Sequence, residues 1–251
     1  MKPGLLSVTF RQLPPQEIIV LANKAGLEGI EWGGDIHVPH DRPDIASAIG
    51  RRTLEAGLEI SAYGSYYRLG DPASGPIEGV LETALALQTG IVRVWAGRKG
   101  YDDSDQAERE AVADDGRTIA RLARQAGLRI ACEWHSQTLT DSAESAAELF
   151  DTVNDPDFLT FWQPRNFQDE VTNLHDMATA LPRLAGLHVF NWDIRTRARL
   201  PLSEGETAWK AYLNKAKVRG SIFASLEFVA GDDPMQMVED AATLRRWLSE
   251  I

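Results

Sequence analysis

The chain has 251 residues, a formal net charge of −11 and a sequence pI near 5.0, and this acidic balance disfavours a nucleic-acid or anionic-membrane partner. It contains no apolar run of about 18 residues, which excludes a transmembrane helix, and the N-terminal apolar stretch is too short for a signal peptide. The single cysteine, Cys132, excludes an internal disulfide, fits a reducing cytoplasm and is expected to be a core residue because it lies in an apolar strand pattern.

A short motif recurs along the chain: a helical end, a glycine, an apolar residue and a brief β-branched or aromatic run. It reads KAGLEGIEW (24–32), EAGLEISAY (55–63), QTGIVRVWA (88–96), QAGLRIACEW (125–134), LAGLHVFNW (184–192) and, more loosely, KVRGSIFASLEF (217–228). LLSVTF (5–10) precedes these motifs as a first strand, and FLTFW (158–162) fills the one long gap between them. We expect the motif glycines to end helices in the left-handed conformation: Gly26, Gly57, Gly90, Gly127, Gly186 and Gly220.

Segments with helical periodicity separate these strands, over residues 18–25, 44–55, 76–87, 106–125, 142–153, 171–181, 206–217 and 235–247. Eight short apolar strands alternating with eight helices imply parallel pairing through helical crossovers. We therefore predict an α/β fold, a (β/α)8 TIM barrel that forms a single domain over residues 1–251. An open doubly wound sheet is the alternative, but no Gly-rich phosphate loop follows the first strand.

Polar side chains stand where the predicted strands end, which is where such barrels carry their chemistry. In the letters ACEWH, Glu133 and His135 are two residues apart and so project from one face of a strand. Gln163, His188 and Glu227 end the next three strands. Oxygen ligands with one imidazole suit one divalent ion such as Mn²⁺, Mg²⁺, Co²⁺ or Zn²⁺. We predict a metal site of Glu133, Gln163, His188 and Glu227; the alternative is that each is a solitary polar residue paired with an arginine.

Other side chains at the strand ends and in the following loops are candidates for binding a substrate: His37, Tyr63, Trp95, His135, Trp162 and Arg195. The two histidines could transfer protons or bind hydroxyls, or could be structural loop residues. Tryptophan offers a sugar a flat apolar face but also packs between barrel and helices, so we expect two or three of five to line the site: Trp32, Trp95, Trp134, Trp162 and Trp192. Three arginines are either anion ligands or surface residues: Arg165, Arg195 and Arg197.

With these strand ends the sequence resembles the xylose isomerase-like TIM-barrel superfamily of sugar isomerases and epimerases, over essentially the whole chain. The resemblance implies one divalent metal ion held by Glu133 in ACEWH, His188 in LHVFNWD and Glu227 in ASLEFV. Gln163 in FWQPRN departs from the family pattern, because an aspartate is usual there, and the change removes one negative charge from the site. Endonuclease IV, a remote member, needs further histidines and a basic DNA surface, and this chain lacks both.

The resemblance implies proton abstraction next to a carbonyl, with Glu133 and Glu227 as acid and base and a metal stabilising the enediolate. The expected function is isomerisation or epimerisation of a small keto-sugar. One alternative is a metal-dependent lyase or dehydratase that eliminates from a keto-sugar or keto-glycoside, which Gln163 favours slightly because altered ligation accompanies altered chemistry on a shared scaffold. Another is a non-catalytic sugar-binding barrel. A homo-oligomer, with exposed Trp209 or Trp247 at an interface, is left open.

Overall fold

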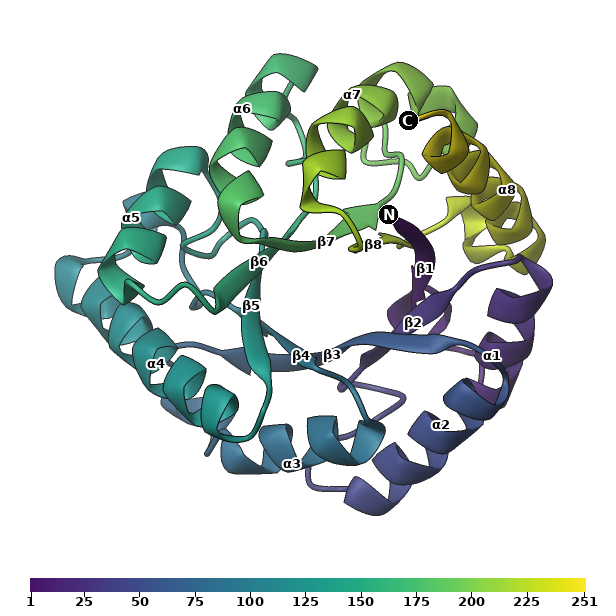
Figure 1. Cartoon of the computed structure of the whole chain (residues 1–251). Helices are drawn as coiled ribbons and strands as arrows, with labels where there is room; N and C mark the ends of the chain where they lie inside the picture. The colour runs from purple at the N-terminus through teal and green to yellow at the C-terminus, as the bar shows by residue number, and fades with distance from the viewer.

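The computed structural model describes residues 1–251 and forms a closed parallel barrel, β1 to β8, inside a ring of eight helices (Figure 1). The strands are β1 (Lys2–Leu6), β2 (Gly29–Gly33), β3 (Glu59–Arg68), β4 (Ile91–Trp95), β5 (Arg129–Glu133), β6 (Phe158–Trp162), β7 (Leu184–Val189) and β8 (Phe223–Leu226). The helices are α1 (Pro15–Lys24), α2 (Pro43–Glu55), α3 (Glu78–Leu87), α4 (Gln106–Gln125), α5 (Ala143–Val153), α6 (Glu170–Ala180), α7 (Glu206–Ala216) and α8 (Pro234–Glu250). The predicted (β/α)8 barrel is confirmed.

The first strand is shorter than the sequence pattern indicates. β1 ends at Leu6, and Ser7–Phe10 form a 3-10 turn. Ser7 explains the change, because its hydroxyl accepts a hydrogen bond from the backbone N–H of Gly33 (2.8 Å) and so takes the place of a strand-to-strand bond. The turn carries the chain from the barrel to the first helix over the end where all eight strands finish.

Four of the six motif glycines have the expected positive φ, namely Gly26, Gly57, Gly127 and Gly220. Gly90 and Gly186 do not. Gln88 ends α3 in the left-handed conformation (φ 68°) in place of Gly90. Gly186 lies inside β7, and its lack of a side chain serves packing rather than a turn.

The barrel interior is filled by a small cluster of Ala62, Ala131, Leu159 and Phe161. A Cβ atom on Gly186 would lie 2.4 Å from Cε1 of Phe161, so only glycine leaves room for this ring. The Phe161 ring also packs against the imidazole of His188, with ring centroids 5.2 Å apart. The interior packing therefore supports the polar groups that stand at the strand ends.

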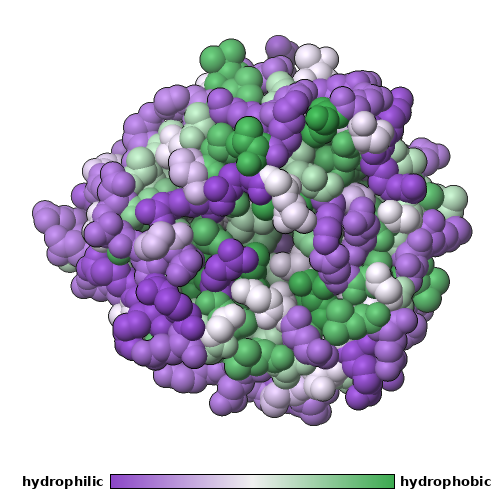
Figure 2. Space-filling model, in the orientation of Figure 1, coloured by the Kyte–Doolittle hydropathy of each residue, from purple (hydrophilic) through white to green (hydrophobic).

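The larger core lies between the strands and the helices, and the outward strand residues fill it. Cys132 is fully buried there, as expected, and burial raises the pKa of its thiol. Trp209 and Trp247 are buried in the same layer, so neither is available as an exposed interface residue. Figure 2, in the orientation of Figure 1, shows a mainly hydrophilic face on which hydrophobic patches are small and separated. No helix is long and apolar enough to span a membrane.

Candidate active site

Five charged or ionisable side chains meet inside the barrel where the strands end: Glu31, Arg93, Glu133, His188 and Glu227. Side chains of a strand alternate between its two faces, so the inward positions follow at every second residue. Ala131 of β5 belongs to the interior cluster, so Glu133, two residues later, is also inward. Gly186 of β7 faces the interior ring of Phe161, so His188, two residues later, is inward as well. All five residues are at least 95% buried.

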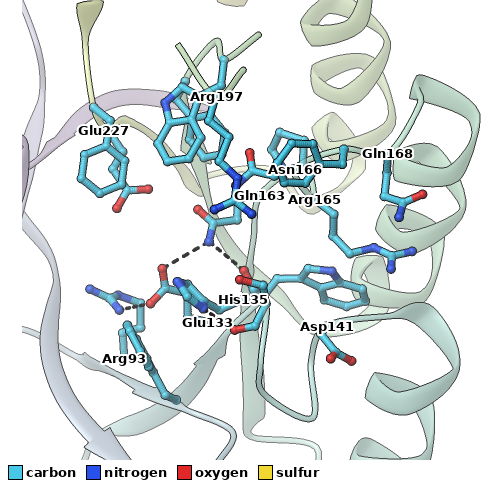
Figure 3. Close-up of a pocket in the computed structure, with 18 of the residues that line it drawn as sticks. Arg93, Glu133, His135, Asp141, Gln163, Arg165, Asn166, Gln168, Arg197 and Glu227 are labelled. Carbon is cyan, nitrogen blue, oxygen red and sulfur yellow. Dashed lines mark hydrogen bonds and ion pairs between the residues drawn. The ribbon is translucent and has the colours of Figure 1, made fainter. Parts of the chain in front are cut away.

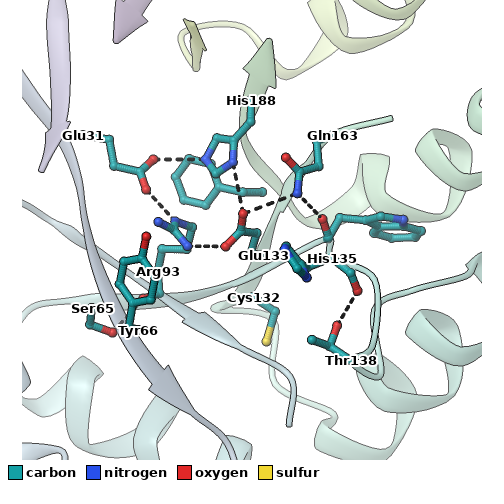
Figure 4. Close-up of polar contacts among 12 residues, drawn as sticks. Glu31, Ser65, Tyr66, Arg93, Cys132, Glu133, His135, Thr138, Gln163 and His188 are labelled. Carbon is teal, nitrogen blue, oxygen red and sulfur yellow. Dashed lines mark hydrogen bonds and ion pairs between the residues drawn. The ribbon is translucent and has the colours of Figure 1, made fainter. Parts of the chain in front are cut away.

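Arg93 lies between two carboxylates (Figure 4). Its Nε donates to Oε1 of Glu31 (2.5 Å), and its Nη1 donates to Oε2 of Glu133. The second oxygen of Glu31 lies 3.2 Å from Nε2 of His188. Glu31 therefore accepts from both the arginine and the imidazole, and this fixes the ring so that Nδ1 points to the other carboxylates.

The remaining atoms of the cluster fit a metal ion. Nδ1 of His188 lies 3.5 Å from Oε1 of Glu133 and 3.7 Å from Oε2 of Glu227, and the ligand atoms of the three residues fall within 4.8 Å of one another. Nδ1 of His188 and Oε2 of Glu227 are buried without a hydrogen-bond partner. Buried polar atoms without partners are costly, and one imidazole nitrogen converging with carboxylate oxygens is a donor set that divalent ions take.

Gln163 stands just after β6 and completes the ring of residues predicted as ligands. Its Nε2 donates to Oε1 of Glu133 (3.3 Å) and to the carbonyl of Trp134 (2.8 Å). The amide nitrogen is thus committed to Glu133, and the amide oxygen lies on the side of Glu227 in Figure 3. Only that oxygen is available as a ligand, because the nitrogen of an amide carries no free lone pair.

The five groups perturb one another strongly. Burial alone would raise the pKa values of Glu133 and Glu31, but the Arg93 charge, and then His188, hold the pKa values of both carboxyls below their usual range. Burial would lower the pKa of His188, yet its carboxylate neighbours, Glu31 first, raise that pKa to about 10. Burial and the charge of Glu133 raise the pKa of Glu227 to about 7. Glu227 is therefore the one carboxyl of the cluster without a dedicated cation.

A cavity of about 420 Å³ opens above this cluster, within the roughly 300–1,000 Å³ of small-molecule sites. Three of the five tryptophans from the strand ends line it, namely Trp95, Trp134 and Trp192. His135 also lines it and stacks on Trp95 with ring centroids 4.5 Å apart. The Nδ1 of His135 lies 2.7 Å from the carbonyl of Ser136, which places its proton on Nδ1 and leaves the lone pair of Nε2 free.

Of the residues predicted to bind substrate, Trp95 and His135 lie in the cavity, and Tyr63 and Trp162 do not. Tyr63 follows the inward Ala62, so it faces the helix layer, where its hydroxyl donates to the carbonyl of Val38. Trp162 lies between the inward positions of β6 and packs on Trp209 and Tyr212 in the outer layer. The period of two along each strand decides both positions.

His37 and Arg195 also lie outside the cavity. Both ring nitrogens of His37 have protein partners, the hydroxyl of Ser7 (2.9 Å) and the carbonyl of Leu13 (3.2 Å). Burial lowers the pKa of His37, and these contacts make it a structural residue of the loop after β2. Arg195 is exposed. Its backbone N–H, and not its guanidinium, donates a hydrogen bond to the carboxylate of Asp193 (3.0 Å).

Two residues of the cluster, Glu31 and Arg93, were absent from the predicted site. A signal for both exists in the sequence, because each is a charged residue on a predicted strand near its end. Arg93 pairs in register with Ala131 and Glu31 with Ala62, and both alanines belong to the interior cluster, so both charged side chains are inward. A buried charge inside a barrel requires a partner of opposite charge, and Arg93 and Glu31 are partners of this kind.

A closed eight-stranded barrel with a site of carboxylates and a histidine at the ends of its strands defines the class of (β/α)8 barrels with a candidate metal centre. The sequence comparison identifies the family within that class. The model of the xylose isomerase-like TIM barrel family matches residues 19–250. The chain belongs to this family.

Among its relatives is the 3-dehydroshikimate dehydratase of Bacillus anthracis, 29% identical over 65% of this chain and 64% of the relative, so the match spans less than two thirds of that protein. The structure of the probable 3-DHS dehydratase AsbF from Bacillus anthracis superposes with a TM-score of 0.82 at 22% identity, covering 98% of this chain and 99% of that one. A xylose isomerase-like barrel of Mycobacterium smegmatis in complex with magnesium has a TM-score of 0.68 at 15% identity, covering 99% and 97%. The two structural matches bear on the fold alone.

Proposed function

We propose that the protein is a metal-dependent lyase that removes water from a small hydroxylated keto compound of the kind that 3-dehydroshikimate represents. The observation that carries this proposal is the buried set of Glu133, His188 and Glu227, with two unpartnered ligand atoms, beneath a cavity that holds the free Nε2 of His135. The 29% identity to a 3-dehydroshikimate dehydratase supports it. The proposal therefore prefers the lyase, given above as an alternative, to the keto-sugar isomerase or epimerase expected first.

The geometry argues against the acid–base pair that epimerisation was expected to use. Epimerisation requires a proton-transfer group on each face of one carbon, and Glu133 and Glu227 were the expected pair. Both oxygens of Glu133 accept hydrogen bonds from protein groups, Oε2 from Arg93 and Oε1 from Gln163. Its lowered pKa also opposes proton uptake. Glu133 is therefore suited to hold an ion and unsuited to carry a proton, which leaves His135 and Glu227 for acid–base work.

The residues divide the proposed reaction as follows. Nε2 of His135 accepts the proton from the carbon next to the carbonyl, and the electron pair of that C–H bond forms the new carbon–carbon double bond as the neighbouring C–O bond breaks. Glu227 delivers a proton to the leaving hydroxyl, which departs as water. Glu133, His188 and Glu227 would hold a divalent ion. The amide oxygen of Gln163 is the fourth ligand in this proposal. When bound, that ion supplies Lewis acidity that makes a hydrogen next to a carbonyl easier to remove.

The test is turnover of 3-dehydroshikimate by protein loaded with Mn²⁺, followed by the ultraviolet absorbance of the conjugated product. We expect activity that EDTA abolishes and that returns with added metal. His135→Gln removes the base and is expected to lower kcat by roughly 10²- to 10⁴-fold. His175→Gln is the matched control, because His175 lies exposed on α6 beside Glu144, away from the cavity.

Exchange in D₂O separates the competing chemistries. A keto-sugar such as D-fructose that exchanges a carbon-bound proton without losing water would contradict the lyase and restore the isomerase or epimerase. A Glu227→Gln protein that retains full turnover would remove Glu227 from the reaction. Protein that binds metal but neither exchanges protons nor eliminates water from any keto compound of a broad panel would favour a non-catalytic binding barrel.

A further inference from the structure

Four arginines line the cavity, and three of them have acidic partners within the protein. Arg11 pairs with Asp35, Arg93 lies between its two glutamates, and Arg165 donates to Asp176 (2.5 and 3.2 Å). The fourth, Arg197, has no hydrogen-bond acceptor and no carboxylate partner for its guanidinium. Five donors directed into a cavity without an acceptor are available to a ligand.

The loop between β7 and α7 presents Arg197 in a defined way. The backbone of Arg197 is left-handed (φ 61°), as is that of Phe167 (φ 64°) in the loop between β6 and α6, and such strained residues concentrate at binding sites. The guanidinium lies over the Phe167 ring, 4.4 Å from its centroid, and Figure 3 shows the side chain of Arg197 reaching into the cavity. An antiparallel bridge between Trp192 and Arg199 closes the loop.

We propose that Arg197 binds a carboxylate of the substrate and so selects keto acids over neutral keto-sugars. This assignment rests on the proposed function, since it takes the cavity to be the substrate site. A planar guanidinium matches a carboxylate with two parallel hydrogen bonds. The Phe167 ring covers one face of the guanidinium and leaves its edge free for this contact.

A carboxylate fits this rim better than a phosphate group does. Barrels that bind phosphate use the loops after β7 and β8 together with the start of a short extra helix. Here the short 3-10 helix after β8, Ala230–Asp232, ends in Asp232, and Asp233 follows it. Asp232 pairs with Arg199 and Asp233 caps α8, so this segment offers a dianion no cation, whereas a single unpaired arginine suffices for one negative charge.

The experiment measures affinity rather than turnover, in a His135→Gln background that does not consume the ligand. The probes are 3-dehydroshikimate, its methyl ester and D-fructose 6-phosphate, titrated calorimetrically into Mn²⁺-loaded protein. We expect the acid to bind at least about tenfold more tightly than the ester, and Arg197→Gln to remove that difference. Arg197→Lys should restore part of it. Arg121→Gln, the same change at an exposed arginine of α4, should leave all three affinities unchanged.

Three outcomes overturn the assignment: the acid binding no more tightly than the ester, Arg197→Gln leaving the preference intact, or the phosphate binding more tightly than the acid through Arg197. Two further outcomes distinguish failure of the proposed lyase from failure of the carboxylate site. If the acid binds through Arg197 but wild-type protein eliminates no water from it, the lyase fails and the carboxylate site stands. If elimination proceeds with the same KM after Arg197→Gln, the lyase stands and the carboxylate site fails.

Discussion

Replacing Glu31 by glutamine tests whether the buried cluster is built to present one nitrogen of His188. Glutamine has the same shape but only one acceptor oxygen. Nε of Arg93 requires that oxygen, because it already donates to Oε1 of Glu31 at 2.5 Å. The amide NH₂ would then face Nε2 of His188, 3.2 Å away, and that nitrogen would have to accept. A neutral imidazole that accepts at Nε2 carries its proton on Nδ1, the atom that faces Glu133 and Glu227.

Two magnitudes follow for the Glu31→Gln protein. Loss of the group that orients a ligating histidine typically weakens metal binding roughly 10- to 100-fold. The cluster also loses a buried charge beside Arg93, which by analogy with broken buried ion pairs costs about 3 kcal/mol of unfolding free energy. At about 2–4 °C per kcal/mol for a chain of this size, the chelated protein should unfold roughly 6–12 °C lower.

Calorimetric titration with Mn²⁺ measures the affinity, and thermal unfolding in EDTA measures the stability. Glu59→Gln is the matched control, because Glu59 forms an exposed ion pair with Lys2 at the far end of β3 and should change neither quantity appreciably. Unchanged Mn²⁺ affinity in a folded Glu31→Gln protein would show that Glu31 does not set the orientation of His188, and the reasoning above would be refuted.

Three further predictions concern the metal-free site and the barrel beneath it. The pKa of His188 is raised from 6.5 to about 10, so its stabilisation is complete below pH 6.5 and is lost as pH rises toward 10; chelated protein should unfold at falling temperatures over this range, and constant stability would contradict the raised pKa. Gln163→Glu turns the donor 3.3 Å from Oε1 of Glu133 into a second acceptor, so chelated protein should lose about 1–3 kcal/mol by denaturant titration and saturating Mn²⁺ should restore it; a loss that metal does not reduce would count against Gln163 as a ligand. Gly186→Ala places a methyl group 2.4 Å from the ring that fills the barrel and should cost about 1–3 kcal/mol, whereas Gly90→Ala, with open space around it, should be neutral in the same titration.

The fold could be predicted from the sequence because each unit of the barrel repeats one local pattern. A helix, a turn and a short apolar strand recur in KAGLEGIEW, QAGLRIACEW and their relatives, and parallel pairing follows from the helical crossovers. The departures are local. Ser7 ends the first strand early with a side-chain hydrogen bond, and Gly186 is required by the ring of Phe161, a contact between strands that no single motif encodes.

The predicted site residues were chosen because they stand where strands end, and strand parity decides which of them meet. Glu133 and His188 lie on inward positions and meet in the structure. Trp162 faces outward, an outcome that parity applied to its strand would have predicted. The choice of Arg195 over Arg197 depended on the backbone of a loop, where a left-handed residue redirects the chain. No periodicity reports such a bend.

The antiparallel bridge that closes the loop after β7 has a consequence for how this protein can change. Arg197 and Phe167 lie in loops whose conformation is set locally, by the Trp192–Arg199 bridge and by their own backbone angles. Glu31 and His188, by contrast, hold one another across the interior of the barrel. A substitution at Phe167 or Arg197 leaves the contact between Glu31 and His188 in place. Under the proposed function, the choice of substrate and the breaking of its bonds therefore rest on separate parts of this chain, so selection can alter the first while the second is inherited.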